Sequence, residues 1–154
     1  MNSIFKYFSF TAIICLANIT LANIVTNKVV GSPYKDVRSN LIDAIEEKAL
    51  NISKIYHASD MLDRTKDSIS NARKIYEQAE IIEFCSANIS HQLVLANPLN
   101  ISACPFKIAL YSLVNNPEQT HIIYTKLSAI DKASEAPSSK ANELVQSLVE
   151  NAAW

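Results

Sequence analysis

Two cysteines constrain the fold of this chain more than any other residues. Cys85 ends a β-branched, apolar segment, and Cys104 precedes Pro-Phe at the start of the next one. A disulfide between them requires the two Cα atoms to lie within about 7 Å, which would tie the ends of these segments together. The third cysteine, Cys15, lies in an N-terminal apolar stretch. The pair is compatible with a structural disulfide, a reactive thiol, a metal site or two inert buried thiols.

The N-terminus has the composition of an export signal. Lys6 supplies a positive charge, residues 7–17 form a short apolar run, and small residues precede a cleavage site after Ala22. The apolar run is shorter than the roughly 20 residues that a spanning helix needs, so we expect cleavage and no membrane attachment afterwards. This assigns residues 1–22 to a signal peptide and residues 23–154 to a single domain. The mature protein is predicted to be periplasmic or secreted, where disulfides persist.

Charge and motif content exclude several classes of function. The full chain has 14 Lys and Arg against 15 Asp and Glu and no basic block, so nucleic acid is not an expected partner. Gly31 is the only glycine, which excludes glycine-rich phosphate loops. The sequence also lacks a nucleophile elbow, a Ser-His-Asp order and paired metal-ligand motifs. We therefore expect no metal and no cofactor, and the sequence favours a protein that is not an enzyme.

The hydrophobic periodicity alternates between strand and helix patterns. It predicts strands over residues 24–30, 52–56, 79–85, 106–114 and 121–127, and helices over residues 33–50, 61–65, 86–97 and 139–151. Ser86 is the expected N-cap of the third helix, and Ser59 or Asp60 that of the short second helix. Residues 115–119 have turn composition, which predicts a hairpin between the last two strands. The order indicates an α+β fold with a mainly antiparallel sheet of about four to five strands and helices on one face.

The single glycine also limits where the backbone can adopt a positive φ. Asparagine is the next most tolerant residue in the left-handed region. The asparagines that sit where the periodicity changes are therefore the expected positions, namely Asn71, Asn97, Asn115 and Asn116.

Three short motifs carry a family resemblance. Met-Leu-Asp-Arg-Thr occupies residues 61–65, Ala-Glu-Ile-Ile-Glu-Phe-Cys-Ser-Ala occupies residues 79–87, and Cys-Pro-Phe occupies residues 104–106 ahead of the hairpin. In their order and spacing they resemble the DUF302 family over roughly residues 25–127, and more closely a cysteine-containing exported subgroup. The resemblance implies a small α+β domain in a periplasmic setting. It implies no reaction, because the family is a domain of unknown function.

The chain departs from that family pattern at two places. Ala49 stands where such relatives tend to have glycine after the first helix. Residues 123–126 replace a strand in which the relatives are expected to carry an arginine, and Lys126 is the only cation there. Lys126 is thus the only residue that can make the anion contact implied for that arginine.

Four other side chains are candidates for a site. A thiol at Cys85 would precede a helix N-terminus, whose dipole lowers a thiol pKa and favours reactivity. His91 lies on the same predicted helix and is the best histidine for a ligand contact. Arg64 either pairs with Asp60 on the helix surface or contacts an anion in a pocket shared with Cys85 and Ser86.

The sequence therefore predicts an exported binding or accessory protein without enzymatic activity, with Cys85 and Cys104 as candidate disulfide partners. Such a disulfide would contribute about 3 kcal/mol to stability. The alternative is a thiol-dependent enzyme that handles redox or sulfur compounds through Cys85. The partner is a small molecule or a protein of unknown identity. Trp154 lies just past the last helix, which suits docking against the domain body or against a second subunit in a homodimer.

Overall fold

A computed structural model describes residues 25–154, and the predicted signal peptide lies outside these residues. Within them the chain forms a five-stranded sheet in the order β1-β5-β4-β3-β2 with all neighbours antiparallel. The strands are β1 (Val25–Val30), β2 (Asn51–His57), β3 (Tyr76–Cys85), β4 (Phe106–Leu113) and β5 (Asn116–Thr125). The helices are α1 (Tyr34–Glu47), α2 (Ala58–Thr65), α3 (Ala87–Ala96) and α4 (Glu135–Ala152). The α+β fold predicted from the sequence is confirmed.

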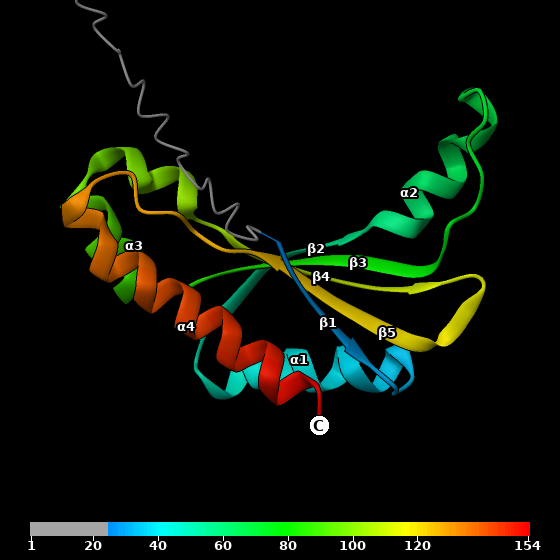
Figure 1. The fold of residues 1–154 in the computed structure, drawn as a ribbon, viewed down its shortest axis with the longest axis horizontal. Coiled ribbons are helices and arrows are strands. Elements are labelled where there is room, and N and C mark those ends of the chain that lie inside the picture. The colour runs from blue at the N-terminus through cyan, green and yellow to red at the C-terminus, as the bar shows by residue number, and fades with distance from the viewer. Residues whose placement is uncertain (1–24) are drawn as a thin grey trace, which may run out of the picture.

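The core lies between one face of the sheet and helices α1 and α4 (Figure 1). Side chains alternate along the strands, so that Ile82, Ile108 and Ile122 point to this face and are fully buried. Helix α1 presents an apolar stripe to them at helical spacing, including Leu41 and Ile45. Burial of each such side chain contributes about 1.5–3 kcal/mol, which makes this layer the main source of stability.

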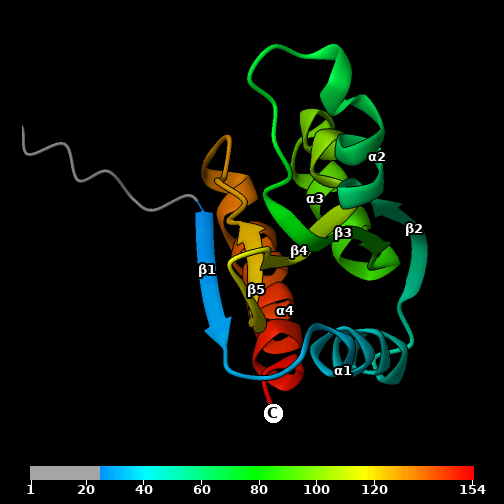
Figure 2. The same ribbon diagram turned by 90° about the vertical axis from the view of Figure 1, so that its right-hand side faces the viewer.

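Helix α2 rises above the opposite face of the sheet at one end (Figure 1). The backbone carbonyl of Ala79 on β3 accepts a hydrogen bond from the Ser59 hydroxyl at 3.4 Å, which holds the helix there. None of the residues of α2 is buried. Helix α2 and the returning segment to Tyr76 thus form an arm, residues 58–75, that projects from the body of the molecule (Figures 1 and 2).

Helix α1 ends in a left-handed turn at Ala49, whose φ is 54°. The Ala49 N–H donates to the carbonyl of Glu46, and the Leu50 N–H donates to the carbonyl of Ile45. These two bonds define a Schellman motif, in which the left-handed residue is usually glycine. The position where the relatives tend to have glycine is therefore a real positive-φ position in this chain, and alanine occupies it. Of the four asparagines predicted for this conformation, only Asn71 has a positive φ.

Several element boundaries differ from those predicted, and β3 begins at Tyr76 rather than at residue 79. The hairpin turn is Val114–Asn115, and β5 begins at Asn116 rather than at residue 121. Pro117 is tolerated in this strand because β1 pairs with β5 only from Thr120 onward, so its missing N–H costs no bond to β1. Helix α4 begins at Glu135 rather than at residue 139, since Pro137 falls in its first turn, where a backbone N–H has no helical partner.

Helix α2 starts earlier than predicted, and neither Ser59 nor Asp60 is its N-cap. The N-cap is His57, which makes no side-chain capping bond. Across residues 25–154, no helix combines the length and the apolar character needed to cross a membrane.

Candidate binding site beside the disulfide

The structure joins Cys85 and Cys104 in a disulfide, with their Cα atoms 6.2 Å apart. Cys85 is the last residue of β3, and Cys104 lies two residues before β4. Because β3 and β4 are antiparallel neighbours, with Phe84 opposite Phe106, the end of one and the start of the other meet at the same edge. The segment between them, α3 and the 3-10 helix Pro98–Ala103, returns the chain to this edge. The Cys104–Pro105 peptide bond is cis.

A surface pocket of about 420 Å³ lies against this disulfide. Three segments that are distant in sequence form its walls: the turn from α1 into β2, one face of α3, and the segment before β4. Helix α3 contributes positions 87, 90, 91 and 94, which fall on one helical face at i, i+3, i+4 and i+7 spacing. The lining residues are Ala49, Leu50, Asn51, Cys85, Ala87, Ser90, His91, Val94, Ile101 and Cys104.

The pocket is mostly apolar and has few polar side chains. Ser90 is the notable one, because its hydroxyl is buried and has no hydrogen-bond partner among the described residues. A buried hydroxyl without a partner costs stability unless something satisfies it. His91 is exposed beside it, and Asn51, the β2 residue that pairs with Cys85, also lines the cavity. A ligand with an apolar body and a polar group would fit this combination.

Three predicted site residues therefore meet at one place: Cys85, Cys104 and His91. Ser86 lies next to them but has a different role. It is buried, and its hydroxyl accepts a hydrogen bond from the Ile89 N–H at 3.5 Å, as predicted for the N-cap of α3. The sequence did not single out Ser90, although its spacing from Ala87, His91 and Val94 is visible in the sequence.

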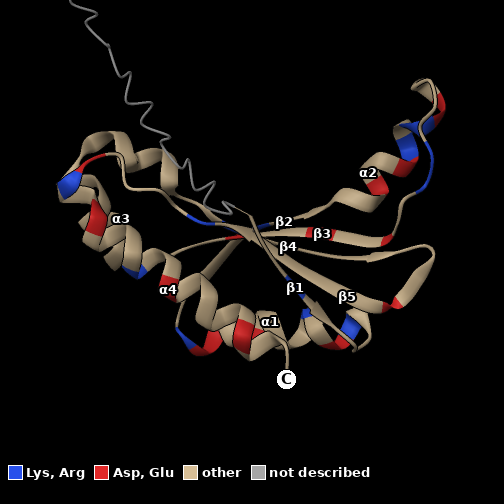
Figure 3. Ribbon diagram, in the orientation of Figure 1, with Lys and Arg blue, Asp and Glu red and all other residues tan. Residues whose placement is uncertain are grey.

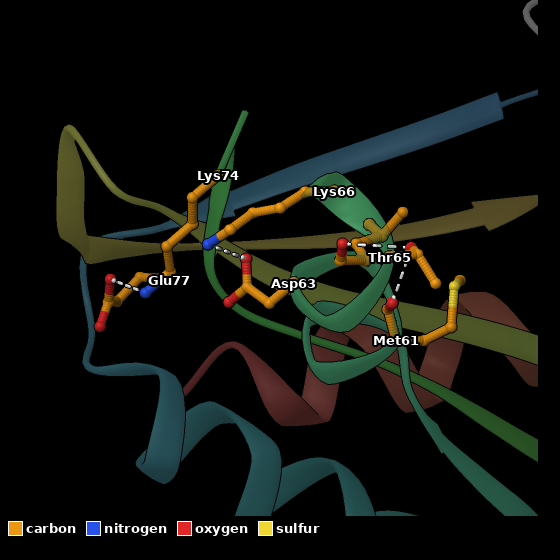
Figure 4. A network of polar contacts seen from close by, with 7 residues as sticks. Met61, Asp63, Thr65, Lys66, Lys74 and Glu77 are labelled. Carbon is orange, nitrogen blue, oxygen red and sulfur yellow. Dashed lines mark hydrogen bonds and ion pairs between the residues drawn. The ribbon is translucent and has the colours of Figure 1, made fainter. Parts of the chain in front are cut away.

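Arg64 does not share this pocket. It lies on α2, which packs near the beginning of β3, whereas Cys85 is at the end of that strand. Among the described residues Arg64 makes no ion pair, so the predicted pairing with Asp60 does not form either. The ion pairs of this arm are Lys66 with Asp63 at 3.9 Å and Lys74 with Glu77 at 3.0 Å (Figure 4).

Lys126 directly follows β5 and does not line the disulfide pocket. It is exposed and contributes to two smaller surface hollows. One, of about 240 Å³, lies between the middle of α4 and the residues on either side of Cys104, and the other, of about 200 Å³, lies between the C-terminal half of α4 and β1. The structure thus brings Lys126 together with neither Arg64 nor Cys85. None of the surface pockets formed by the described residues is lined by more than one of these three residues.

A polar cluster that the sequence did not predict joins α1 to the sheet. Arg38 Nε donates to Glu80 Oε2 at 2.5 Å, and His57 Nδ1 lies 2.8 Å from Glu80 Oε1. His57 and Glu80 are directly opposite each other on β2 and β3. Burial and the negative charge of Glu80 raise the pKa of the Tyr34 phenol well above its usual value. This cluster positions α1 against the sheet and does not line the disulfide pocket.

No group of three or more His, Cys, Asp or Glu side chains with metal-binding geometry occurs in residues 25–154. The fold and the site together define a small α+β domain with an antiparallel sheet and a disulfide-lined pocket. The model of the family described as "Domain of unknown function DUF302" matches residues 26–153. The chain belongs to the DUF302 family.

Comparison with solved structures supports the same fold. The chain is similar to the crystal structure of an uncharacterized conserved DUF302 protein from Bacillus stearothermophilus, with a TM-score of 0.70 and 12% sequence identity. The similarity covers 85% of this chain and 99% of the other one. At this level of identity the likeness shows the fold alone. No curated protein matches the chain.

Proposed function

We propose that this chain is an exported binding protein without enzymatic activity, and that its ligand occupies the pocket beside the Cys85–Cys104 disulfide. The observation that carries the proposal is a cavity of about 420 Å³ whose lining includes Ser90, a residue with a buried hydroxyl that is unpartnered among the described residues. The volume lies within the range of about 300–1,000 Å³ that small-molecule sites span. The ligand is a small molecule with an apolar body and one group that hydrogen-bonds to Ser90.

The export part of the proposal rests on the N-terminal sequence and on the disulfide. The apolar run at residues 7–17 and the small residues before position 23 have the composition of a cleavable signal. Disulfides persist mainly in oxidising compartments such as the periplasm or the cell exterior. Amino-terminal sequencing of protein recovered from the periplasm of an expressing bacterium tests this part. A mature N-terminus at Asn23 is expected, and retention of Met1 in the cytoplasm would contradict it.

Two matched probes test the binding site. p-Cresol carries an aromatic ring and one hydroxyl, and toluene has the same shape without the hydroxyl. We expect p-cresol to shift backbone amide NMR signals of α3 and residues 49–51, and to bind about fivefold to tenfold more tightly than toluene. This ratio corresponds to one neutral hydrogen bond.

Ser90→Ala should abolish this discrimination while toluene still binds. Ser102→Ala is the matched control, since Ser102 is exposed and lies outside the pocket. Signal changes outside the pocket, or an unchanged ratio in Ser90→Ala, would show that the pocket is not the binding site.

The second candidate function is a thiol-dependent enzyme for redox or sulfur compounds. It is favoured by one observation, that both cysteines line the pocket and are only half-buried. This function needs Cys85 as a thiolate during turnover. In a glutathione redox buffer, rapid formation of a mixed disulfide at Cys85 would favour the enzyme, whereas a protein that stays bridged supports the binding function.

A further inference from the structure

Strand β1 forms one edge of the sheet, and its outer side is free of other described elements (Figure 2). Its inner side pairs with β5 over all six residues, Val25 to Val30, without a register shift. The side chains of Val25, Asn27 and Val29 are exposed, the two valines by 58% and 45%. An edge strand of this kind presents unpaired N–H and C=O groups to another chain.

The two edges of the sheet differ in a way that singles out β1. At the other edge, β2 contains a register shift between Ile52 and Lys54, and α2 follows it directly. Bulges of this kind disrupt edge-to-edge pairing. Strand β1 has no proline and no bulge, and its one charge, Lys28, is on the residue row that faces the helices. Lys28 is the only charged residue of this strand, and the ribbon of β1 is mostly tan in the charge-coloured view (Figure 3).

We propose that β1 is a dimerisation strand, which pairs antiparallel with β1 of a second copy of this chain and joins the two sheets into one. The pairing places a twofold axis perpendicular to the joined sheet. Two residues that pair directly across the axis must have their side chains on the same face of the joined sheet. Residues 25, 27 and 29 share one face of β1, so each of them pairs with one of these three residues in the partner. Two registers overlap by five residues: one is centred on Asn27 and the other on Lys28.

The sequence of β1 favours the register centred on Asn27. In that register Val25 faces the partner's Val29 on both sides of the axis, and Asn27 faces the same residue of the partner. Such β-branched pairs and amide pairs stabilise neighbouring strands. Lys28 then faces the hydroxyl of the partner's Thr26. In the other register Lys28 would face its own copy directly, and like charges at this position are destabilising.

This self-complementarity is the reason for choosing a second copy as the occupant rather than an unrelated strand. The one charge of the strand, Lys28, lies on the inner residue row, so the outer row does not select an acidic or a basic peptide. Each of the five overlapping side chains in the favoured register finds a suitable partner in the same sequence. Below the strand, Lys28 lines a surface hollow with Gln146 and Glu150 of α4. These polar side chains would form the rim of the interface.

Charge substitutions at Asn27 test the proposal, because this residue would meet itself on the axis. The full chain is expressed in a host that exports it, and the mature product is studied by sedimentation equilibrium over a concentration series. Wild type is expected to be a monomer–dimer equilibrium. Asn27→Lys and Asn27→Glu should each weaken the dimer, and an equimolar mixture of the two variants should restore it. We expect the dissociation constant of the mixture to be about tenfold lower than that of either variant alone.

Cross-linking fixes the register. Asn27→Cys, treated with a short bis-maleimide, should give a covalent dimer in high yield, whereas Val29→Cys should not, because Val29 faces the partner's Val25. Circular dichroism of each variant checks that the fold is retained. A wild type that stays monomeric throughout the series overturns the proposal, as does a dimer whose strength is the same for both Asn27 charge variants and their mixture. Cross-linking of Val29→Cys but not Asn27→Cys overturns the register.

Discussion

The Cys85–Cys104 disulfide gives the sharpest prediction about stability. The two residues are 19 positions apart. In the chain-entropy model, cross-linking a loop of this length removes about 11 cal/mol/K of entropy from the unfolded chain, which is about 3 kcal/mol at 25 °C. The unfolding entropy of a domain of about 130 residues is about 0.27 kcal/mol/K near its midpoint. Loss of the bond should therefore lower the Tm by about 10 °C.

Two perturbations distinguish the stability contributed by the cross-link from the stability contributed by packing of the sulfur atoms. Reduction of wild type breaks the bond and leaves both thiols in place, while Cys85→Ala combined with Cys104→Ala also removes the sulfur atoms. Both cysteines are half-buried, so the sulfur contacts should add less than about 1 kcal/mol to the difference. Urea unfolding followed by circular dichroism at 222 nm measures both free energies. We expect reduced wild type to lose about 3 kcal/mol and the double variant to lose slightly more.

A thiol titration in denaturant, with and without prior reduction, establishes the starting state. Mature wild type should show no free thiol before reduction and two afterwards. The argument would be refuted if both thiols titrate without reduction. It would equally be refuted if the bond forms but its reduction costs less than about 1 kcal/mol, since the loop would then already be ordered in the unfolded state.

Three further predictions concern backbone conformation and pH. Ala49→Gly should raise the free energy of unfolding by about 1 kcal/mol in urea, because φ is 54° at this position and glycine adopts it without strain. Hydrogen bonds from Asn97 and Ser134 lower the pKa of Asp131. The stabilising effect of the ionised carboxylate is therefore present at neutral pH and is lost as the pH falls through the folded pKa. Urea unfolding should show Asp131→Ala less stable than wild type at pH 7 and equal to it in acid. The raised pKa of Tyr34 keeps the folded phenol neutral when the unfolded one ionises, so stability should fall above about pH 10. Tyr34→Phe should lose less stability than wild type over that range, as measured by urea unfolding, because only the Tyr34 contribution is removed.

The elements that the sequence predicted best are those with a long, regular hydrophobic pattern. Helix α1 and strands β1 and β4 were expected within a few residues of their observed bounds, because their apolar side chains face a single core. The start of β5 was missed because Asn116 and Pro117 have turn composition. Only the pairing partners show that this end of the strand extends past β1, where proline is tolerated.

Features of the site that depend on local sequence were predictable. Features that depend on the pairing register of the strands were not. The N-cap role of Ser86 follows from the residues after it, and the structure bears it out. The Arg38, Glu80 and His57 cluster could not be predicted, since it depends on which residue of β2 faces which residue of β3. A pocket shared with Cys85 was one of two alternatives for Arg64, and the structure does not form it, because α2 packs near the start of β3 and Cys85 is at the end of that strand.

The antiparallel order of β3 and β4 connects the disulfide to the pocket. A parallel crossover would place the end of β3 and the start of β4 at opposite edges, where no bond could form. The antiparallel arrangement brings Cys104 and Ile101 back beside α3, so the same chain reversal that permits the bond also closes one wall of the cavity. Ser90 and His91 line the same cavity from the helix that starts after Cys85. In the proposed binding function the two cysteines therefore do not need to react, because the bond between them holds together the walls of the pocket.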